Sequence, residues 1–219
     1  MNNPAGPLST HSSSPNSSSP NSSVSISYGP NVANEAELRL LGDVKGKRVV
    51  ELGLPVGRPN SIALALSGAR CIAIDNSAER IASGRRAAEA GEVRVEFHQS
   101  ELAELGFVTS SSVDLVLCVE RLTTVDDIDR LLRQVHRILK SEATFVAVLE
   151  HPASAMFDDD DSVARRRYGA ESGLTIGELC MSLQRSNFSL DVLYELMPTN
   201  KPRALVPSTL AIRARKLGS

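Results

Sequence analysis

The stretch VVELGLPVGRPN, from Val49 to Asn60, decides the fold class of this 219-residue chain. It begins with a short apolar run, which is typical of a strand buried on both faces of a parallel sheet. Two glycines, Gly53 and Gly57, follow in a turn, and Pro59 stands where a helix tolerates proline, in its first turn. A strand, a glycine turn and a helix in this order predict a loop whose backbone closely approaches a bound ligand.

The same alternation of strand and helix patterns continues along the chain. Helix starts are expected at Ser77, at a Thr124–Asp127 capping box and at a Thr175–Glu178 capping box, and an earlier helix is expected over 35–42. The chain therefore predicts an α/β fold with a doubly wound, mostly parallel sheet and a C-terminal antiparallel hairpin. The expected strands are 48–52, 70–75, 93–98, 113–119 and 143–150, and the hairpin strands are 188–197 and 208–216.

Composition predicts one domain with a tail. Residues 1–27 form a Ser/Asn/Pro-rich stretch without charged side chains, which we expect to be disordered, and residues 28–217 form the domain. The tail has no arginine, so a transit peptide is the weaker interpretation, and it also lacks the features of a signal peptide. The three cysteines are far apart in sequence and are expected to be reduced thiols rather than metal ligands.

Charge and hydropathy limit the expected partners. A net charge of −2 gives no basic field for nucleic acid, and no apolar run is long enough to cross a membrane. We therefore expect a cytoplasmic protein that binds neither nucleic acid nor a membrane and is a monomer or homodimer.

Ligands of doubly wound sheets bind beyond the carboxyl ends of the strands. Asp75 ends the second expected strand, about 20 residues after the glycine turn, at a place where a carboxylate can accept both hydroxyls of a ribose. The turn and this carboxylate together predict a nucleotide-like cofactor.

These segments resemble the class I S-adenosylmethionine-dependent methyltransferases, and among them the small-molecule, type 11-like enzymes. The resemblance covers Glu35 to Lys216 and implies a seven-stranded sheet whose last strand is antiparallel. It also implies S-adenosylmethionine as the cofactor and a small-molecule O, N or C nucleophile as the acceptor. The segments that carry it are VVELGLPVG, IAIDNSAERI, VRVEFHQSELAELGF, SVDLVLCV, LLRQVHRILKSEATFVAV and GELCMSLQRSNF.

The resemblance assigns parts of the cofactor to particular residues. The glycine turn lines its methionine part, Asp75 holds its ribose, Asn76 lies beside its adenine, and Glu101 or Leu102 faces the adenine amino group. Val119 and Glu120 lie beside the sulfonium. The implied cofactor site is Glu51, Gly53, Pro55, Gly57, Asp75, Asn76, Glu101, Leu102, Val119 and Glu120.

The turn departs from the family pattern at Leu54 and Pro55, which replace a small residue and a glycine. Proline has no N–H and restricts the residue before it. If that N–H normally serves the cofactor carboxylate, its loss costs about 1–3 kcal/mol. A second departure, KSEA at Lys140–Ala143, lies at the far end of the sheet and is expected to be structural.

Candidates for proton removal are few. His151 directly follows the fifth expected strand, and Tyr28, just before the first helix, could close over the site; each also has a purely structural interpretation. His98 and His136 are interpreted as structural. The stretch 157–169, with four consecutive aspartates followed by three arginines, is interpreted as a solvated lid over the acceptor rather than a metal site.

Two alternatives to a methyltransferase remain. A non-catalytic methyltransferase-like binding or regulatory protein would keep the same fold and the same core. A nicotinamide-dependent oxidoreductase shares the ribose carboxylate, but Gly53 and Gly57 do not give its GxGxxG spacing. The sequence CVERL after the fourth expected strand lacks the asparagine-proline-proline-aromatic motif of enzymes that methylate amino groups of DNA bases or protein glutamine.

Overall fold

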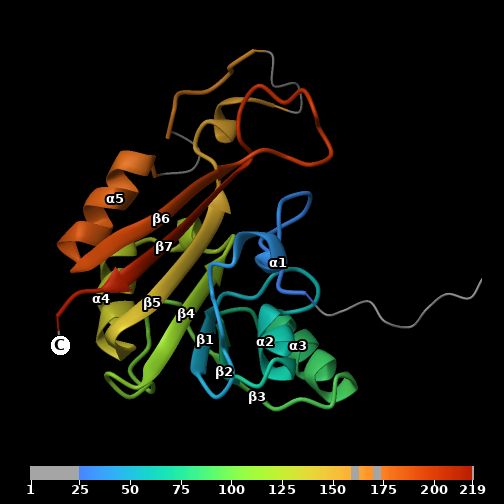
Figure 1. Cartoon of the computed structure of the whole chain (residues 1–219), viewed down its shortest axis with the longest axis vertical. Helices are drawn as coiled ribbons and strands as arrows, with labels where there is room; N and C mark the ends of the chain where they lie inside the picture. The colour runs from blue at the N-terminus through green and yellow to red at the C-terminus, as the bar shows by residue number, and fades with distance from the viewer. Residues whose placement is uncertain (1–24, 159–162, 170–173, 219) are drawn as a thin grey trace, which may run out of the picture.

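The computed structural model describes residues 25–158, 163–169 and 174–218, and its centre is one seven-stranded sheet (Figure 1). The strand order is β3-β2-β1-β4-β5-β7-β6; β1 to β5 pair in parallel, and β7 pairs antiparallel with both β5 and β6. This confirms the predicted fold class, including the antiparallel hairpin. The strands are β1 (Arg48–Leu52), β2 (Arg70–Asp75), β3 (Val95–Gln99), β4 (Val113–Val119), β5 (Leu139–Glu150), β6 (Phe188–Leu196) and β7 (Thr209–Lys216).

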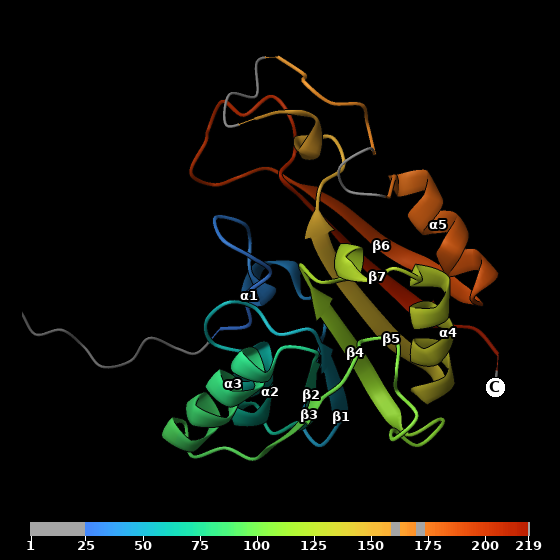
Figure 2. The same ribbon diagram turned by 180° about the vertical axis from the view of Figure 1, so that it is seen from behind.

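Helices cover both faces of the sheet (Figures 1 and 2). One face carries α1 (Glu35–Leu38), α2 (Asn60–Leu66) and α3 (Ala78–Ala90). The other carries α4 (Ile128–Ile138) and α5 (Ile176–Arg185). Each face has its own large apolar cluster, as expected for a sheet buried on both sides. Two single turns of 3₁₀ helix, η1 (Leu122–Thr124) and η2 (Ser154–Met156), follow β4 and β5.

Most predicted helix starts are confirmed, and one is wrong. Ser77 caps α3, and Thr175 with Glu178 forms the capping box of α5. The predicted Thr124–Asp127 box does not form, because Thr124 belongs to η1. Asp127 itself caps α4 by accepting the Arg130 N–H at 2.7 Å, and aspartate at this position is as good a cap as threonine.

The first helix is shorter than predicted. It was expected to extend to Gly42, but α1 ends at Leu38 and Arg39 adopts a left-handed conformation with φ 51°. The carboxylate of Glu35 explains the early end, because it accepts the backbone N–H groups of Leu40 and Leu41 at 2.9 and 3.0 Å. These two donors are therefore turned away from the helix.

The carboxyl ends of the parallel strands lie at one edge of the sheet, and the segments after β5 and between β6 and β7 extend beyond that edge (Figure 1). Most of the predicted tail, residues 1–24, lies outside the described residues. Its last three residues are described, and the Ser27 N–H donates to the Asn60 side chain at 2.8 Å. Among the described residues no helix has the length and apolar character needed to cross a membrane.

Candidate functional site

The glycine turn after β1 folds back onto β2. Gly53 has φ +74°, a conformation that favours glycine, and its N–H donates to the Ile74 carbonyl at 2.7 Å. The next N–H, that of Leu54, donates to Asp75 Oδ2 at 2.7 Å. The Leu54 side chain is buried beside Ala73 and Ile81, so the first departure from the family pattern has become part of the core.

The space above Gly53 is filled by a side chain from the segment that follows the neighbouring strand, β4. A Cβ atom placed on Gly53 would lie 2.3 Å from Cγ of Arg121 and 2.4 Å from its Cβ. Arg121 follows β4 by two residues. Its Nε atom is buried and has no hydrogen-bond partner among the residues that the structure describes. No motif in the sequence singles out this arginine.

Glu51 caps a helix. Its two carboxylate oxygens accept the N–H groups of Asn60 at 2.9 Å and Ser61 at 2.7 Å, at the start of α2. Pro59, the N-cap residue of α2, has no side-chain hydrogen bond of its own. Burial raises the pKa of Glu51 to about 7, against the opposing effect of the hydrogen bonds from Ser61 and Asn60. Glu51 therefore joins the end of β1 to the start of α2.

Asp75 lies at the end of β2 and is fully buried. Arg80 Nε and Nη2 donate to its two oxygens at 2.9 and 2.8 Å, and the N–H groups of Leu54 and Ser77 each donate at 2.7 Å. Burial alone would raise the pKa of Asp75, but the bonds from Arg80, Leu54 and Ser77 hold it below its ordinary value. The carboxylate is ionised and has four donors from the chain itself.

A small cavity lies beside the end of β2. Asn76 Nδ2 donates to Glu101 Oε2 at 3.4 Å, and the two residues share a cavity of about 250 Å³ with Leu102. Thr124 and Arg130 also line this cavity. The structure thus brings together the three residues that the resemblance assigned to the adenine.

The end of β4 places a carboxylate at the same edge. Val119 is buried, whereas Glu120 is exposed and has φ +60°, which is uncommon for a residue with a side chain. The Glu120 N–H donates to the Val148 carbonyl at 2.7 Å, which holds this conformation. Its Oε1 lies 3.0 Å from the position of a Cβ on Gly29, and no described residue donates a hydrogen bond to its carboxylate.

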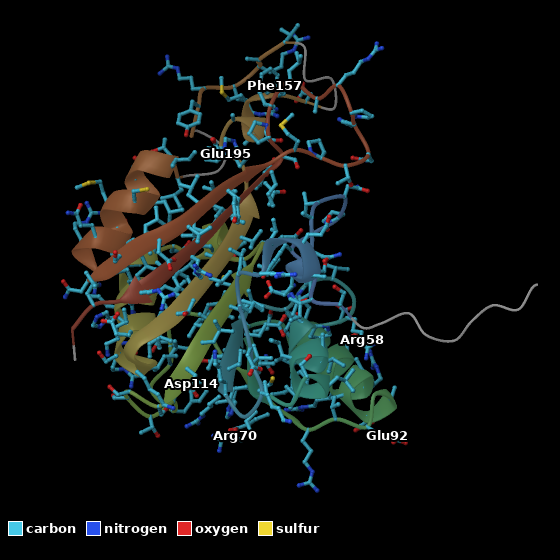
Figure 3. The ribbon with its side chains drawn as sticks, viewed as in Figure 1. Arg58, Arg70, Glu92, Asp114, Phe157 and Glu195 are labelled. Atoms are coloured by element: carbon cyan, nitrogen blue, oxygen red, sulfur yellow. The ribbon has the colours of Figure 1, made fainter. Side chains whose placement is uncertain are left out.

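His151 is buried at the end of β5 with both ring nitrogens bonded. Nδ1 accepts the Ala153 N–H at 3.1 Å, so the proton lies on Nε2, which is 2.9 Å from Glu195 Oε1. Figure 3 shows Glu195, near the end of β6, and Phe157, after β5, toward the end of the sheet opposite the one that carries Asp114. In this conformation His151 connects the end of β5 to β6.

Tyr28 is also engaged. Its side chain is buried in the core, and its hydroxyl donates to Glu35 Oε2. Burial, followed by the hydrogen bond to Glu35, raises the pKa of this hydroxyl far above its ordinary value. The phenol is therefore neutral and faces α1.

The expected lid, residues 157–169, is described except for 159–162. Arg166 pairs with Asp158 at 2.6 Å, as expected for the aspartate and arginine runs. Near it, a cavity of about 200 Å³ is lined by Asn31, Ser154, Phe157 and Ser208, among others. No group of three or more His, Cys, Asp or Glu side chains in the described part of the chain could hold a metal ion.

Comparisons with known proteins agree with this geometry. Residues 50–147 match the model of a family described as a methyltransferase domain. No curated protein sequence matches the chain. An S-adenosylmethionine dependent methyltransferase from Mesorhizobium loti is 24% identical, with 81% of this chain and 94% of that chain covered and a TM-score of 0.67.

Two further solved structures show the same architecture. A SAM dependent methyltransferase from Aquifex aeolicus is 15% identical over 84% of this chain and 89% of that chain, with a TM-score of 0.65. The 1,6-didemethyltoxoflavin-N1-methyltransferase from Burkholderia thailandensis is 20% identical over 80% of this chain and 72% of that chain, with a TM-score of 0.58. Its structure holds 1,6-didemethyltoxoflavin and S-adenosylhomocysteine.

The fold and the position of the site at the carboxyl ends of β1, β2 and β4 define a class I, Rossmann-like methyltransferase fold. Residues 50–147 match a methyltransferase domain, and the sheet has the class I methyltransferase fold that the resemblance in the sequence implied.

Proposed function

We propose that this chain binds S-adenosylmethionine beyond β1, β2 and β4 and transfers the methyl group to a small-molecule O, N or C nucleophile. One observation carries the proposal: the ionised carboxylate of Asp75 stands at the end of β2 beside the glycine turn, in the matched domain. A carboxylate at this point of a doubly wound sheet accepts ribose hydroxyls.

The residues present fit the cofactor. The Asn76–Glu101 pair and its cavity suit an adenine, and the buried, unpartnered Nε of Arg121 suits an anionic group beside the glycine turn. Asp75 can receive ribose hydroxyls only if they replace donors that it now has, and Arg80 is the donor on a flexible side chain. When bound, S-adenosylmethionine supplies an electrophilic methyl group on its sulfonium.

The protein's own contribution is to hold the acceptor in line and to remove a proton where the nucleophile carries one. His151 and Tyr28 are candidates for proton removal, but each would first have to give up its present hydrogen bonds. Glu120 has an exposed carboxylate with no donor among the described residues. Glu120 is therefore the third candidate, and it needs no rearrangement.

A small-molecule acceptor is supported by size and charge. The cavity near Phe157 holds about 200 Å³, and the net charge of −2 provides no general attraction for nucleic acid. The Burkholderia structure, which holds 1,6-didemethyltoxoflavin, supports the same acceptor class. We also propose a cytoplasmic monomer or homodimer that acts without a membrane or nucleic acid.

A non-catalytic protein that keeps the fold is the second candidate function. One observation favours it: all four donors to Asp75 come from the chain itself. The two functions differ in whether the cofactor can displace one of these donors.

The test is calorimetric titration of S-adenosylmethionine and S-adenosylhomocysteine into the wild type and Asp75→Asn. Asp114→Asn is the matched control, because Asp114 also accepts a backbone N–H and pairs with a cation, Lys140, but lies at the opposite edge of the sheet (Figure 3). We expect binding by the wild type and the control and a loss of at least tenfold in Asp75→Asn. Absence of binding by the wild type at millimolar cofactor would exclude the methyltransferase.

A further inference from the structure

The cofactor loop has few free hydrogen-bond donors. The Gly53 N–H donates to the Ile74 carbonyl, and the Leu54 N–H donates to Asp75. Pro55 has no N–H. Three consecutive residues of the loop therefore offer no backbone donor to a ligand, and an anionic group bound above them needs a donor from another element.

Arg121 is placed to supply that donor. Arg121 is the second residue after β4, and its side chain lies directly over Gly53. A Cβ atom on Gly53 would collide with this side chain. The contact joins the end of β4 to the loop after β1, and these two strands are neighbours in the sheet. The aliphatic part of Arg121 thus packs on Gly53, and Nε, which is bonded to Cδ, comes close to the residues that lack donors.

The charge of Arg121 is uncompensated in the described part of the chain. Its Nε is buried without a partner, and its guanidinium forms no ion pair or hydrogen bond with a described residue. Arg80, by contrast, is paired with Asp75, and the guanidinium of Arg137 donates to the carbonyls of Leu105 and Val108. Burial of an N–H group without an acceptor costs free energy. The described residues around Arg121 supply no acceptor for its Nε, and a bound ligand can supply one.

We propose that Arg121 binds the α-carboxylate of S-adenosylmethionine and replaces the backbone donor that Pro55 removed. This inference rests on the proposed function. The carboxylate is the only anionic group of this cofactor, and a guanidinium binds a carboxylate through two parallel hydrogen bonds. Arg121 is thus a cofactor-positioning residue. Pro55 is tolerated because the guanidinium supplies the hydrogen bonds that a backbone N–H at position 55 would otherwise supply.

Two ligands separate this role from a structural one. S-Adenosylhomocysteine carries the carboxylate, whereas 5′-methylthioadenosine has the adenine, the ribose and the sulfur but no amino-acid part. Calorimetric titration of both ligands into the wild type, Arg121→Met and the double variant Pro55→Gly/Arg121→Met tests the proposal. Arg133→Met, an exposed change on α4, is the control.

We expect Arg121→Met to bind S-adenosylhomocysteine about tenfold to a hundredfold more weakly, the range for a hydrogen bond between charged groups. Its affinity for 5′-methylthioadenosine should stay within twofold of the wild type. The double variant, which regains a backbone N–H, should recover part of the loss. Equal weakening of both ligands, or no weakening of either, would overturn the role of Arg121 while leaving the proposed function intact. A wild type that binds neither ligand would refute the proposed function itself.

Discussion

Replacement of Arg80 by methionine should lower the stability of the protein and raise its affinity for the cofactor. Arg80 supplies two of the four hydrogen bonds to Asp75, at 2.8 and 2.9 Å, from the first turn of α3. Methionine keeps much of the length of the side chain and its helix propensity but removes both donors. The backbone N–H groups of Leu54 and Ser77 remain on the carboxylate.

The size of both effects follows from the burial of the pair. The Asp75 side chain is 1% exposed and that of Arg80 is 25% exposed, so the pair is mostly removed from water. Loss of one partner of a buried pair costs about 3–5 kcal/mol, and the two remaining N–H donors place this case near the lower end. Ribose hydroxyls would no longer compete with charged hydrogen bonds worth about 1.5–3 kcal/mol, which corresponds to a gain of roughly one to two decades in affinity.

Urea denaturation followed by circular dichroism measures the first effect, and calorimetric titration of S-adenosylhomocysteine measures the second. Arg86→Met is the matched control, because Arg86 is exposed on the same helix. Lower stability together with lower affinity would show that Arg80 supports the site rather than competes with the ribose. Unchanged stability would show that the ion pair contributes little, and the reasoning would then be refuted.

Three further predictions concern pH, packing and thiol reactivity. Because burial raises the pKa of Glu51 from 4.5 to about 7, the folded state holds this proton more tightly than the unfolded chain. The free energy of unfolding should therefore fall by about 3 kcal/mol as the pH rises through this window, and urea titrations at several pH values should show no such fall in Glu51→Gln. Gly84→Ala should destabilise the protein by about 1–3 kcal/mol in thermal melts, despite a better helix propensity, because the new Cβ would lie 2.5 Å from the Phe97 ring; a rise in melting temperature would contradict this. A thiol reagent at pH 8 should modify Cys180 alone in the native state, as checked by mass spectrometry, because burial raises the pKa of each of the other two thiols to about 12.

The sequence predicted the elements with strong periodicity. The apolar residues of α4 recur with the period of a helix, and the short apolar run from Val113 to Val119 is typical of a buried strand. The structure contains this helix and this strand. The ends of helices were less predictable where one side chain accepts hydrogen bonds from backbone N–H groups. Glu35 ends α1 early by accepting two N–H groups, and Asp127 starts α4 in place of Thr124. Such competition between neighbouring caps depends on geometry that spacing alone does not express.

The site was predictable to the level of strand ends. Asp75 and Asn76 had to lie at the carboxyl edge once β2 was recognised, because parallel strands share their direction. The charged partner of Asp75 was not predictable, since Arg80 lies on a segment that also contains Arg85 and Arg86, and nothing in the sequence sets the direction of its side chain. The sequence does not set the direction of the His151 side chain either. Its ring could have faced the site, but in the structure it contacts Glu195.

The order of the strands divides the sheet into two parts that are each continuous in sequence. The part β3-β2-β1-β4 comes entirely from residues before α4, and the part β5-β7-β6 comes entirely from residues after it. The two parts meet where β4 pairs in parallel with β5. The exposed residues Thr123 and Asp126 lie between these two strands in the sequence. A chain opened there would yield two fragments suited to complementation, one with the proposed cofactor residues from Glu51 to Arg121 and the other with most of the cavity near Phe157. Cofactor loading and acceptor recognition would then reside on separate, exchangeable pieces.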